Sequence, residues 1–289
     1  MSDEQYDAAL DLLSRLNPGS VQENLMALIS LEPTLADDLL SSVDQPLKLL
    51  KPKLQQQNDN TTGVGKDFLC CDYNRDGDYY RSPWTNKYYN LGTGQQTQET
   101  EESYFPGDEL RNWEQLFNDS FEVYKDMYYE NGGVSSCYLW ETSEIEDNTY
   151  DNGFAGVVLF QKGKGQLGKW DSIHVFEVSK ETEDAFNYKL TSTIILHLND
   201  NDKTKLGGNL TRQVEKVIKR QPDNIALDEF HITNVGSMVE DIETQMRTML
   251  EVVYFEKTMD IYHQLKFAVD TSDNRAKQQE DIIKGLQNL

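Results

Sequence analysis

The sequence predicts an α+β fold, in which short helices precede a five-stranded antiparallel sheet and a long helix follows it. Near both ends of the chain, apolar residues recur every three or four positions, as in amphipathic helices. Between residues 135 and 219, apolar and polar residues tend to alternate instead, which favours strands. The connections between these strands are too short for helical crossovers, so we expect an antiparallel meander with one face covered.

Residues 1–52 are expected to form a stalk of short helices. An apolar stripe of leucines at Leu10–Leu16 is interrupted by Pro18–Gly19, and a second helical pattern follows. A third pattern begins at Pro33 and ends before Pro46. Three short amphipathic helices in series favour a small antiparallel bundle.

A polar linker at residues 53–66 leads into a region, 67–133, that combines an unusual turn, a polar segment and an aromatic helix. The polar segment, 90–107, is expected to be mobile and functionally dispensable. The helix should run from Asp108 to Tyr129, because large apolar side chains recur there at intervals of three and four. So many aromatic residues on one stripe indicate core packing rather than a ligand cage.

The unusual turn runs from Cys71 to Trp84, reads CDYNRDGDYYRSPW, and permits two interpretations. One is a calcium loop of the EF-hand type, because suitable residues occupy positions 1, 3, 5 and 6 of such a loop: Asp72, Asn74, Asp76 and Gly77. Position 12, however, is Pro83, which has no side-chain oxygen to close the site. The other interpretation is a tight surface turn, which we favour, since Asn, Asp and Gly tolerate left-handed backbone.

The sheet is assigned to residues 134–220. Its five strand candidates are separated by Gly, Asp and Asn turns: SSCYLW, GFAGVVLF, WDSIHVFEV, NYKLTSTIILHL and GNLTRQVEKV. The segment GKGQLG at 163–168 matches the spacing of a dinucleotide-binding motif. A strand follows it where such a site needs a helix, so a hairpin loop explains the glycines better.

A long helix is expected in residues 221–269. Asn234 can cap it, and one wide apolar face continues from Val235 to about Phe267. No Gly or Pro interrupts Ser237–Val269, which favours one continuous helix long enough to cover the sheet.

The C-terminal segment, 270–289, is the strongest candidate in the sequence for a segment that binds a partner protein. Four aliphatic side chains fall on one face of a short helix: Ile282, Ile283, Leu286 and Leu289. The segment is otherwise too polar to fold alone, which is typical of a helix that binds in a groove of a partner. The alternative is that it packs back on the body of the protein or frays.

Composition excludes several classes of function. The net charge of −23 opposes a nucleic-acid or anionic-membrane surface spread over the chain. No apolar run is long enough to span a membrane, and the acidic N-terminus is unlike a signal peptide. The three cysteines give neither a disulfide framework nor a zinc spacing, and the histidines form no catalytic arrangement. We therefore expect a cytoplasmic, non-enzymatic protein without a metal or cofactor.

The unusual turn resembles the signature of the beta-subunit family of the heterodimeric F-actin-capping proteins, which reads much like CDYNRDGDSYRSPW. The residues that carry this structural signature are Cys71, Asp72, Tyr73, Asn74, Arg75, Asp76, Gly77 and Asp78. The sequence departs at Tyr79, where the family more often has a small residue. The resemblance continues through LLSSVDQPLK at 39–48 and through YLW, GFAGV, WDSIHV and YKLTST in the strands. Residues 90–107 look like an insertion relative to the family.

The resemblance implies a function and partners. Members of this family form an obligate heterodimer with an alpha subunit, bind the barbed end of the actin filament and block subunit addition and loss there, without calcium. Their C-terminal tail inserts into the hydrophobic cleft of the terminal actin, which assigns actin binding to the four aliphatic residues of the tail. Regulators with capping-protein-interaction motifs grip the N-terminal helices, so Arg15 and Asp44 are candidate contacts, and phosphoinositides are further candidate partners. The alternative is a calcium-binding acidic scaffold or interaction protein.

Overall fold

The computed structural model describes these residues: 3–16, 20–36, 39, 46–53, 65–97, 103–129, 132–142, 153–163, 168–182, 184–200, 204–220 and 226–252. The chain divides into two compact units, residues 1–240 and 241–289. Within the residues described, no helix is both long enough and apolar enough to cross a membrane.

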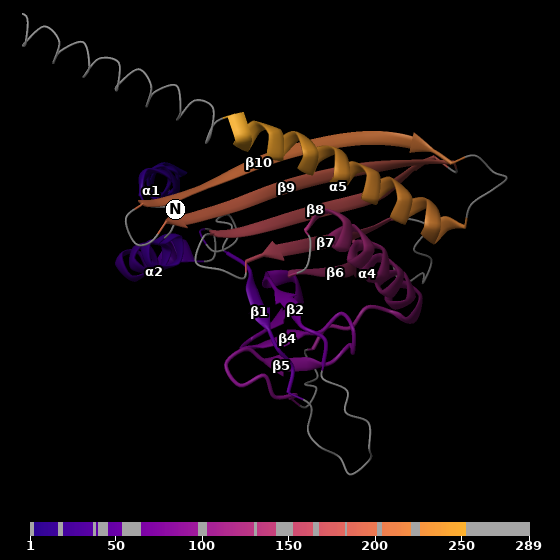
Figure 1. Ribbon diagram of the computed structural model, residues 1–289, viewed down its shortest axis with the longest axis horizontal. Helices are drawn as coiled ribbons and strands as arrows, with labels where there is room; N and C mark the ends of the chain where they lie inside the picture. The colour runs from indigo at the N-terminus through magenta and orange to yellow at the C-terminus, as the bar shows by residue number, and fades with distance from the viewer. Residues whose placement is uncertain are drawn as a thin grey trace, which may run out of the picture. The chain divides into compact units, whose positions relative to one another are not determined.

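A five-stranded antiparallel sheet is the largest element of the first unit (Figure 1). Its strands are β6 (Gly133–Glu141), β7 (Gly153–Lys162), β8 (Gly168–Thr182), β9 (Ala185–Asp200) and β10 (Thr204–Lys219). Each strand pairs with the next one along the chain, so the order across the sheet is β10-β9-β8-β7-β6. The predicted meander is thereby confirmed.

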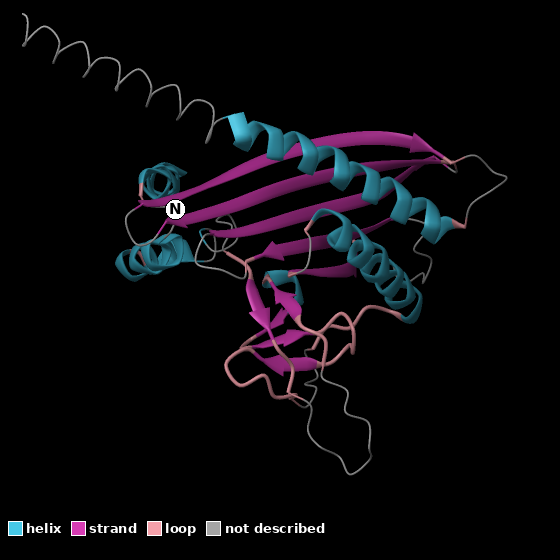
Figure 2. Cartoon of the chain, viewed as in Figure 1, coloured by secondary structure: helices cyan, strands magenta, loops and turns pink. Residues whose placement is uncertain are grey.

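Helix α4, Asp108–Tyr128, lies against the sheet (Figure 2). Its aromatic side chains pack on one face of the sheet. Phe117 stacks on Phe176 of β8 with ring centroids 5.7 Å apart, and Phe121 meets Phe160 of β7 at 5.8 Å. Both helix residues are fully buried. Most of the predicted stripe is therefore part of the core, whereas its members Leu116 and Tyr128 are 42% and 38% exposed.

Helix α5, Leu227–Glu251, begins earlier than predicted. The predicted cap, Asn234, lies inside the helix, where its amide donates a hydrogen bond to the hydroxyl of Tyr188 at 3.1 Å. That prediction was wrong because the apolar spacing continues back to the buried Phe230, while acidic residues occupy the first turn, where the helix dipole favours them. The predicted continuation to residue 269 lies outside the described residues.

Part of the opposite face of the sheet is covered as well, in addition to the one covered face that was predicted. Strand β1, Lys48–Leu50, pairs antiparallel with β2, Phe68–Cys70. These segments help to form a buried cluster on that face: Leu47, Leu69, Tyr138, Val157, Leu159, Ile173 and Ile195. Strand β7 is buried along its whole length up to Gln161. Its unbroken apolar run has no polar side to present to water.

The N-terminal helical region ends earlier than the predicted stalk, which was expected to reach residue 52. Helix α1 (Asp3–Arg15), helix α2 (Val21–Leu31) and the 3-10 helix η2 (Pro33–Leu35) precede β1. They share a small buried cluster: Ala9, Leu25, Leu35 and Leu39. The predicted stalk reached residue 52, whereas residues 48–50 form a strand, because β2 offers them main-chain partners.

Leu47 is fixed to the sheet through both of its backbone polar groups. Its N–H donates to Oδ2 of Asp171 at 3.0 Å, and its carbonyl accepts from Nε2 of Gln161 at 3.0 Å and from Nζ of Lys169 at 2.8 Å. Burial raises the pKa of the Asp171 carboxyl, and Lys169, 2.9 Å away, lowers it in part. This Leu47 clamp joins the N-terminal segment to β7 and β8.

A small sheet carries the signature turn and the start of the polar segment. Its strands are β3 (Arg75–Asp76), β4 (Tyr79–Arg81) and β5 (Tyr88–Asn90). The flanks of the polar segment are held in place: the Lys53 N–H donates to the Gly94 carbonyl at 2.7 Å, and Ser103 donates to the Asp76 carboxylate at 2.8 Å. Both flanks are thus tied to the small sheet or its neighbours, and the mobility of the segment stays a prediction. The centre, 98–102, lies outside the described residues.

Candidate functional site

The signature forms a compact hairpin that its own side chains hold closed. The 3-10 turn η3, Asp72–Asn74, precedes β3, and Gly77 at the tip has a left-handed φ of +55°. Asn74 is 2% exposed. Its Oδ1 accepts from the Cys71 N–H at 2.9 Å, and its Nδ2 donates to the Arg81 carbonyl at 2.9 Å. One carboxamide thus joins the beginning and the end of the hairpin.

These contacts count against a calcium loop. The Asn74 carboxamide is occupied by backbone, Asp76 accepts a hydrogen bond from Ser103, and Asp72 lies 3.9 Å from the guanidinium of Arg75. In the parts of the chain that the structure describes, no cluster of three or more His, Cys, Asp or Glu is placed to hold a metal ion. The geometry supports the tight-turn interpretation.

The other signature residues attach the hairpin to the sheet or lie at its surface. Tyr73 stacks on Trp140 of β6, with ring centroids 4.6 Å apart and an interplanar angle of 8°. Burial raises the pKa of the Cys71 thiol to about 12, so this thiol stays protonated at neutral pH. Arg75 donates through Nε to the Gly77 carbonyl at 2.7 Å, and Asp78 is exposed. A structural role accounts for each of these contacts.

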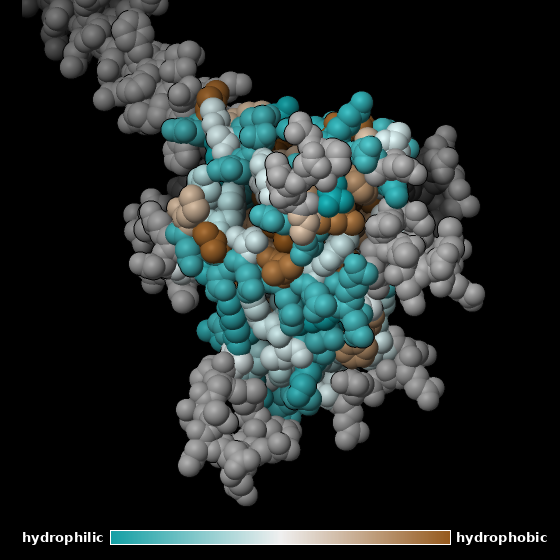
Figure 3. All heavy atoms as spheres, turned by 90° about the vertical axis from the view of Figure 1, so that its right-hand side faces the viewer, coloured by the Kyte–Doolittle hydropathy of each residue, from teal (hydrophilic) through white to brown (hydrophobic). Residues whose placement is uncertain are grey.

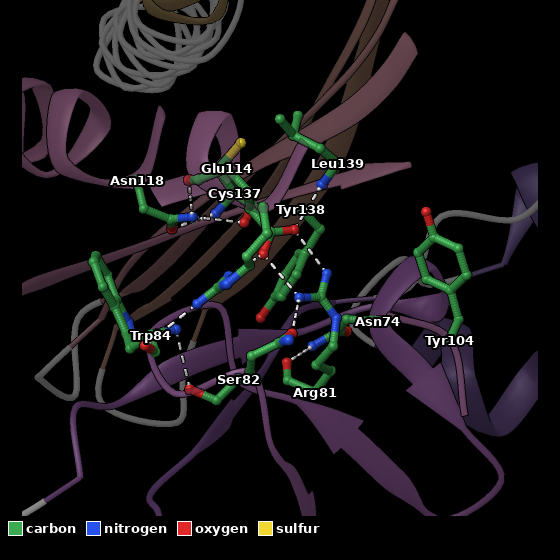
Figure 4. A network of polar contacts seen from close by, with 12 residues as sticks. Asn74, Arg81, Ser82, Trp84, Tyr104, Glu114, Asn118, Cys137, Tyr138 and Leu139 are labelled. Atoms are coloured by element: carbon green, nitrogen blue, oxygen red, sulfur yellow. Dashed lines mark hydrogen bonds and ion pairs between the residues drawn. The ribbon is translucent and has the colours of Figure 1, made fainter. Parts of the chain in front are cut away.

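A buried ion pair joins the hairpin to helix α4 (Figure 4). Arg81 meets both carboxylate oxygens of Glu114, at 2.8 and 2.7 Å, and the two side chains are 2% and 0% exposed. Arg111 contacts the same carboxylate. Burial lowers the pKa of the Arg81 guanidinium, but the hydrogen bond and charge of Glu114 outweigh it and raise the pKa overall. Bidentate pairs of this kind fix orientation as well as distance.

Glu114 and Asn118 of α4 also bind the backbone of β6 (Figure 4). Oδ1 of Asn118 accepts from the Cys137 N–H at 2.8 Å, and its Nδ2 donates to the Cys137 carbonyl at 2.8 Å. Oε2 of Glu114 accepts from the Leu139 N–H at 2.9 Å. Sequence reasoning missed both residues, although two polar residues four positions apart on the inner face of an aromatic stripe were a usable signal.

The structure describes only one of the predicted binding residues near the ends of the chain. Arg15 is the last residue of α1. Asp44 lies outside the described residues, and so do the four predicted actin contacts, Ile282, Ile283, Leu286 and Leu289. Their roles stay predictions.

The two edge strands of the five-stranded sheet differ in their neighbours: β6 has α4 beside it, and β10 has only β9 among the described strands. Strand β10 has β9 on one side and forms the other edge of the sheet. Its described side chains from Asn209 to Lys219 are exposed or half-buried, and Val217 is 52% exposed. Figure 3 shows that hydrophobic atoms surface in patches among hydrophilic ones on the face it views. The opposite edge, β6, lies against α4.

The chain matches known proteins along most of its length. Its residues 6–262 match the family model described as F-actin capping protein, beta subunit. The F-actin-capping protein subunit beta of Candida glabrata is 53% identical, covering 99% of this chain and 100% of that protein. The corresponding subunits of Saccharomyces cerevisiae and Drosophila melanogaster are 51% and 44% identical, covering 100% and 99% of this chain and 100% and 96% of those proteins.

The fold is also similar to that of a solved structure, the homodimeric actin capping protein alpha subunit from Plasmodium berghei. The TM-score is 0.53 at 16% identity, and the similarity covers 91% of this chain and 96% of that chain. This similarity supports the α+β fold alone. The family model and the full-length relatives agree with the hairpin signature, and the chain therefore belongs to the F-actin capping protein beta-subunit family.

Proposed function

We propose that this chain caps the barbed end of the actin filament as the beta subunit of a heterodimer with an alpha subunit. The family match over residues 6–262 carries this proposal. The complex covers the fast-growing end and blocks both addition and loss of actin subunits by steric occlusion. The proposed mechanism has no catalytic step and uses no calcium or other cofactor, and its place is the actin cytoskeleton in the cytoplasm.

The edge strand β10 supports pairing with an alpha subunit. It is 16 residues long, and a strand at the edge of a sheet offers main-chain donors and acceptors to a partner strand. The net charge of −23 also favours a more basic partner, because actin filaments are themselves acidic and this chain cannot attract them by broad charge complementarity. We propose that the alpha subunit extends the sheet at β10.

The C-terminal tail adds an apolar contact with actin in this proposal. The spacing of Ile282, Ile283, Leu286 and Leu289 places all four on one face of a helix. Burying an aliphatic side chain contributes roughly 1.5 to 3 kcal/mol, from which the costs of ordering and association must be subtracted. The tail therefore tightens binding but does not set it alone.

The N-terminal helices are the proposed site for regulators. Arg15 at the end of α1 and Asp44 are the candidate contacts for capping-protein-interaction motifs, and phosphoinositides are a further candidate ligand class.

Seeded elongation of actin at barbed ends tests the proposal. The chain is co-purified with an alpha subunit, both at full length and cut after Thr271. Arrest of growth at substoichiometric concentrations by the full-length complex, weakened by the truncation, is the expected result. Unchanged elongation at every dose would reject the capping function.

The tail is tested by Ile282→Ser combined with Leu286→Ser. Dissociation from filament ends should be at least tenfold faster, because tenfold corresponds to about 1.4 kcal/mol and two apolar side chains are removed. Gln287→Ser with Asn288→Ser is the matched control at polar positions, and it should leave dissociation unchanged. A double variant that no longer assembles with the alpha subunit would show that the tail is structural.

A further inference from the structure

Helix α4 lies along β6, at the opposite end of the sheet from β10 (Figure 1). At an edge strand, alternate residues turn their N–H and C=O groups away from the sheet, and such groups can pair with a further strand. Cys137 and Leu139 are two alternate residues of β6 whose groups point away from β7, because α4 side chains bind them. Side chains of α4 therefore occupy these hydrogen-bonding groups on the outer edge of β6.

Asn118 binds Cys137 as a residue of a neighbouring strand would. In an antiparallel pair, two opposed residues exchange both of their N–H to O=C hydrogen bonds. The carboxamide of Asn118 carries the same donor and acceptor as a peptide group, and it accepts from and donates to Cys137 at 2.8 Å each. Asn118 is 1% exposed and Cys137 is fully buried.

Side chains also bind outward-facing backbone groups of β6 two residues away from Cys137 in both directions. Glu114 accepts from the Leu139 N–H at 2.9 Å. At the other end of β6, the hydroxyl of Ser136 donates to the Ser135 carbonyl at 2.8 Å. Side chains thus reach the backbone at residues 135, 137 and 139.

We propose that Asn118 and Glu114 stand in for a sixth strand, so that the sheet can be extended only at β10. This inference rests on the proposed pairing of the alpha subunit at β10. A sheet open at both edges can take a partner on each side, and repeated pairing of that kind gives open chains instead of closed complexes. Closing β6 limits the assembly to one alpha subunit for each copy of this chain.

Packing alone does not account for these polar residues. A leucine at position 118 would suit the aromatic inner face of α4, but the Cys137 N–H and C=O would then be buried without partners. Glu114 is costlier still to bury, and it is held in place by Arg81 and Arg111. The ion pair therefore positions a carboxylate oxygen at the Leu139 N–H.

The test is Asn118→Ala in the complex with the alpha subunit, with Asn112→Ala as the matched control at an exposed position of the same helix. Hydrogen exchange of the Cys137 amide should be at least tenfold faster in Asn118→Ala and unchanged in the control. Analytical ultracentrifugation should show growth beyond the 1:1 complex with rising concentration for Asn118→Ala alone. Asn118→Ser, which keeps a hydroxyl near Cys137, is the second variant if the alanine variant fails to fold.

Two results overturn the inference. One is a folded Asn118 variant that stays a 1:1 complex at every concentration, whatever its exchange rates. The other is rapid exchange of the Cys137 and Leu139 amides in the wild-type complex, at the rate of solvent-exposed amides, and this measurement needs no variant. Neither experiment contains actin, so failure of the wild-type complex to arrest filament growth rejects the proposed function separately.

Discussion

Replacing Arg81 by methionine should destabilise the protein far more than breaking an exposed ion pair does. Arg81 and Glu114 are 2% and 0% exposed, so the substitution removes one of the partners of a fully buried carboxylate. Removing one partner of a buried pair typically costs about 3 to 5 kcal/mol. Arg111 and the Leu139 N–H still bind Glu114, so we expect the lower end, about 3 kcal/mol.

Urea denaturation of the complex with the alpha subunit, followed by fluorescence, measures this loss. In thermal unfolding it corresponds to a lowering of the midpoint by roughly 6 to 12 °C for a chain of this size. The control is Arg75→Met in the same hairpin, because its 3.9 Å contact with Asp72 is largely exposed. Such a pair contributes about 0 to 1 kcal/mol. Equal, small losses in both variants would refute the view that the buried pair holds the hairpin on α4.

Two further predictions concern the core of the first unit. Burial, with a smaller effect of Arg220, lowers the pKa of His231 to about 4, so the folded state disfavours its protonation. The free energy of unfolding should therefore be highest above about pH 6.5 and should fall by roughly 3 kcal/mol as the pH is lowered from there through about 4. His231→Gln should make the free energy of unfolding less dependent on pH. An equally steep pH dependence in the variant would assign the effect to other groups. A Cβ on Gly156 would lie 2.5 Å from side-chain atoms of Leu139 and Phe176, so Gly156→Ala should cost about 1 to 3 kcal/mol. The control is Gly236→Ala, because a Cβ at this position meets nothing within 4 Å, and it should stabilise α5 by up to about 1 kcal/mol. Equal effects of the two substitutions on stability would show that the core side chains around residue 156 move aside to accommodate the added methyl group.

Elements with a strong local pattern could be predicted from the sequence. The strands were evident because turn residues separate them and because residues such as Leu190 and Ile194 in β9 alternate with polar ones. Helix α4 was evident from its aromatic spacing, and its predicted start at Asp108 agrees with the structure. The hairpin could be recognised as a turn because Asn, Asp and Gly favour one locally.

The missed features depend on contacts between distant parts of the chain. Asn118 and Glu114 meet β6 at residues that lie 19 and 25 positions later in the chain. Their four-residue spacing could mark them as polar residues on the inner face of α4, but it could not show that they bind a strand edge. The second covered face depends on β1 and β2, which are too short to stand out as strands before their partners are known. Asn234 is a good capping residue by type, but its amide is directed to Tyr188 of β9. Propensity is a weak guide where tertiary packing decides.

The Leu47 clamp determines how a mechanical load passes through the protein. Tension along the N-terminal segment reaches the sheet at Leu47, whose N–H donates to Asp171 and whose carbonyl accepts from Gln161 and Lys169. Behind it, the ladder between β1 and β2 carries load in shear, so several bonds must break at once. A ligand that pulls on α1 or α2 therefore strains β7 and β8 in the interior of the sheet, and leaves the edge at β10 unloaded.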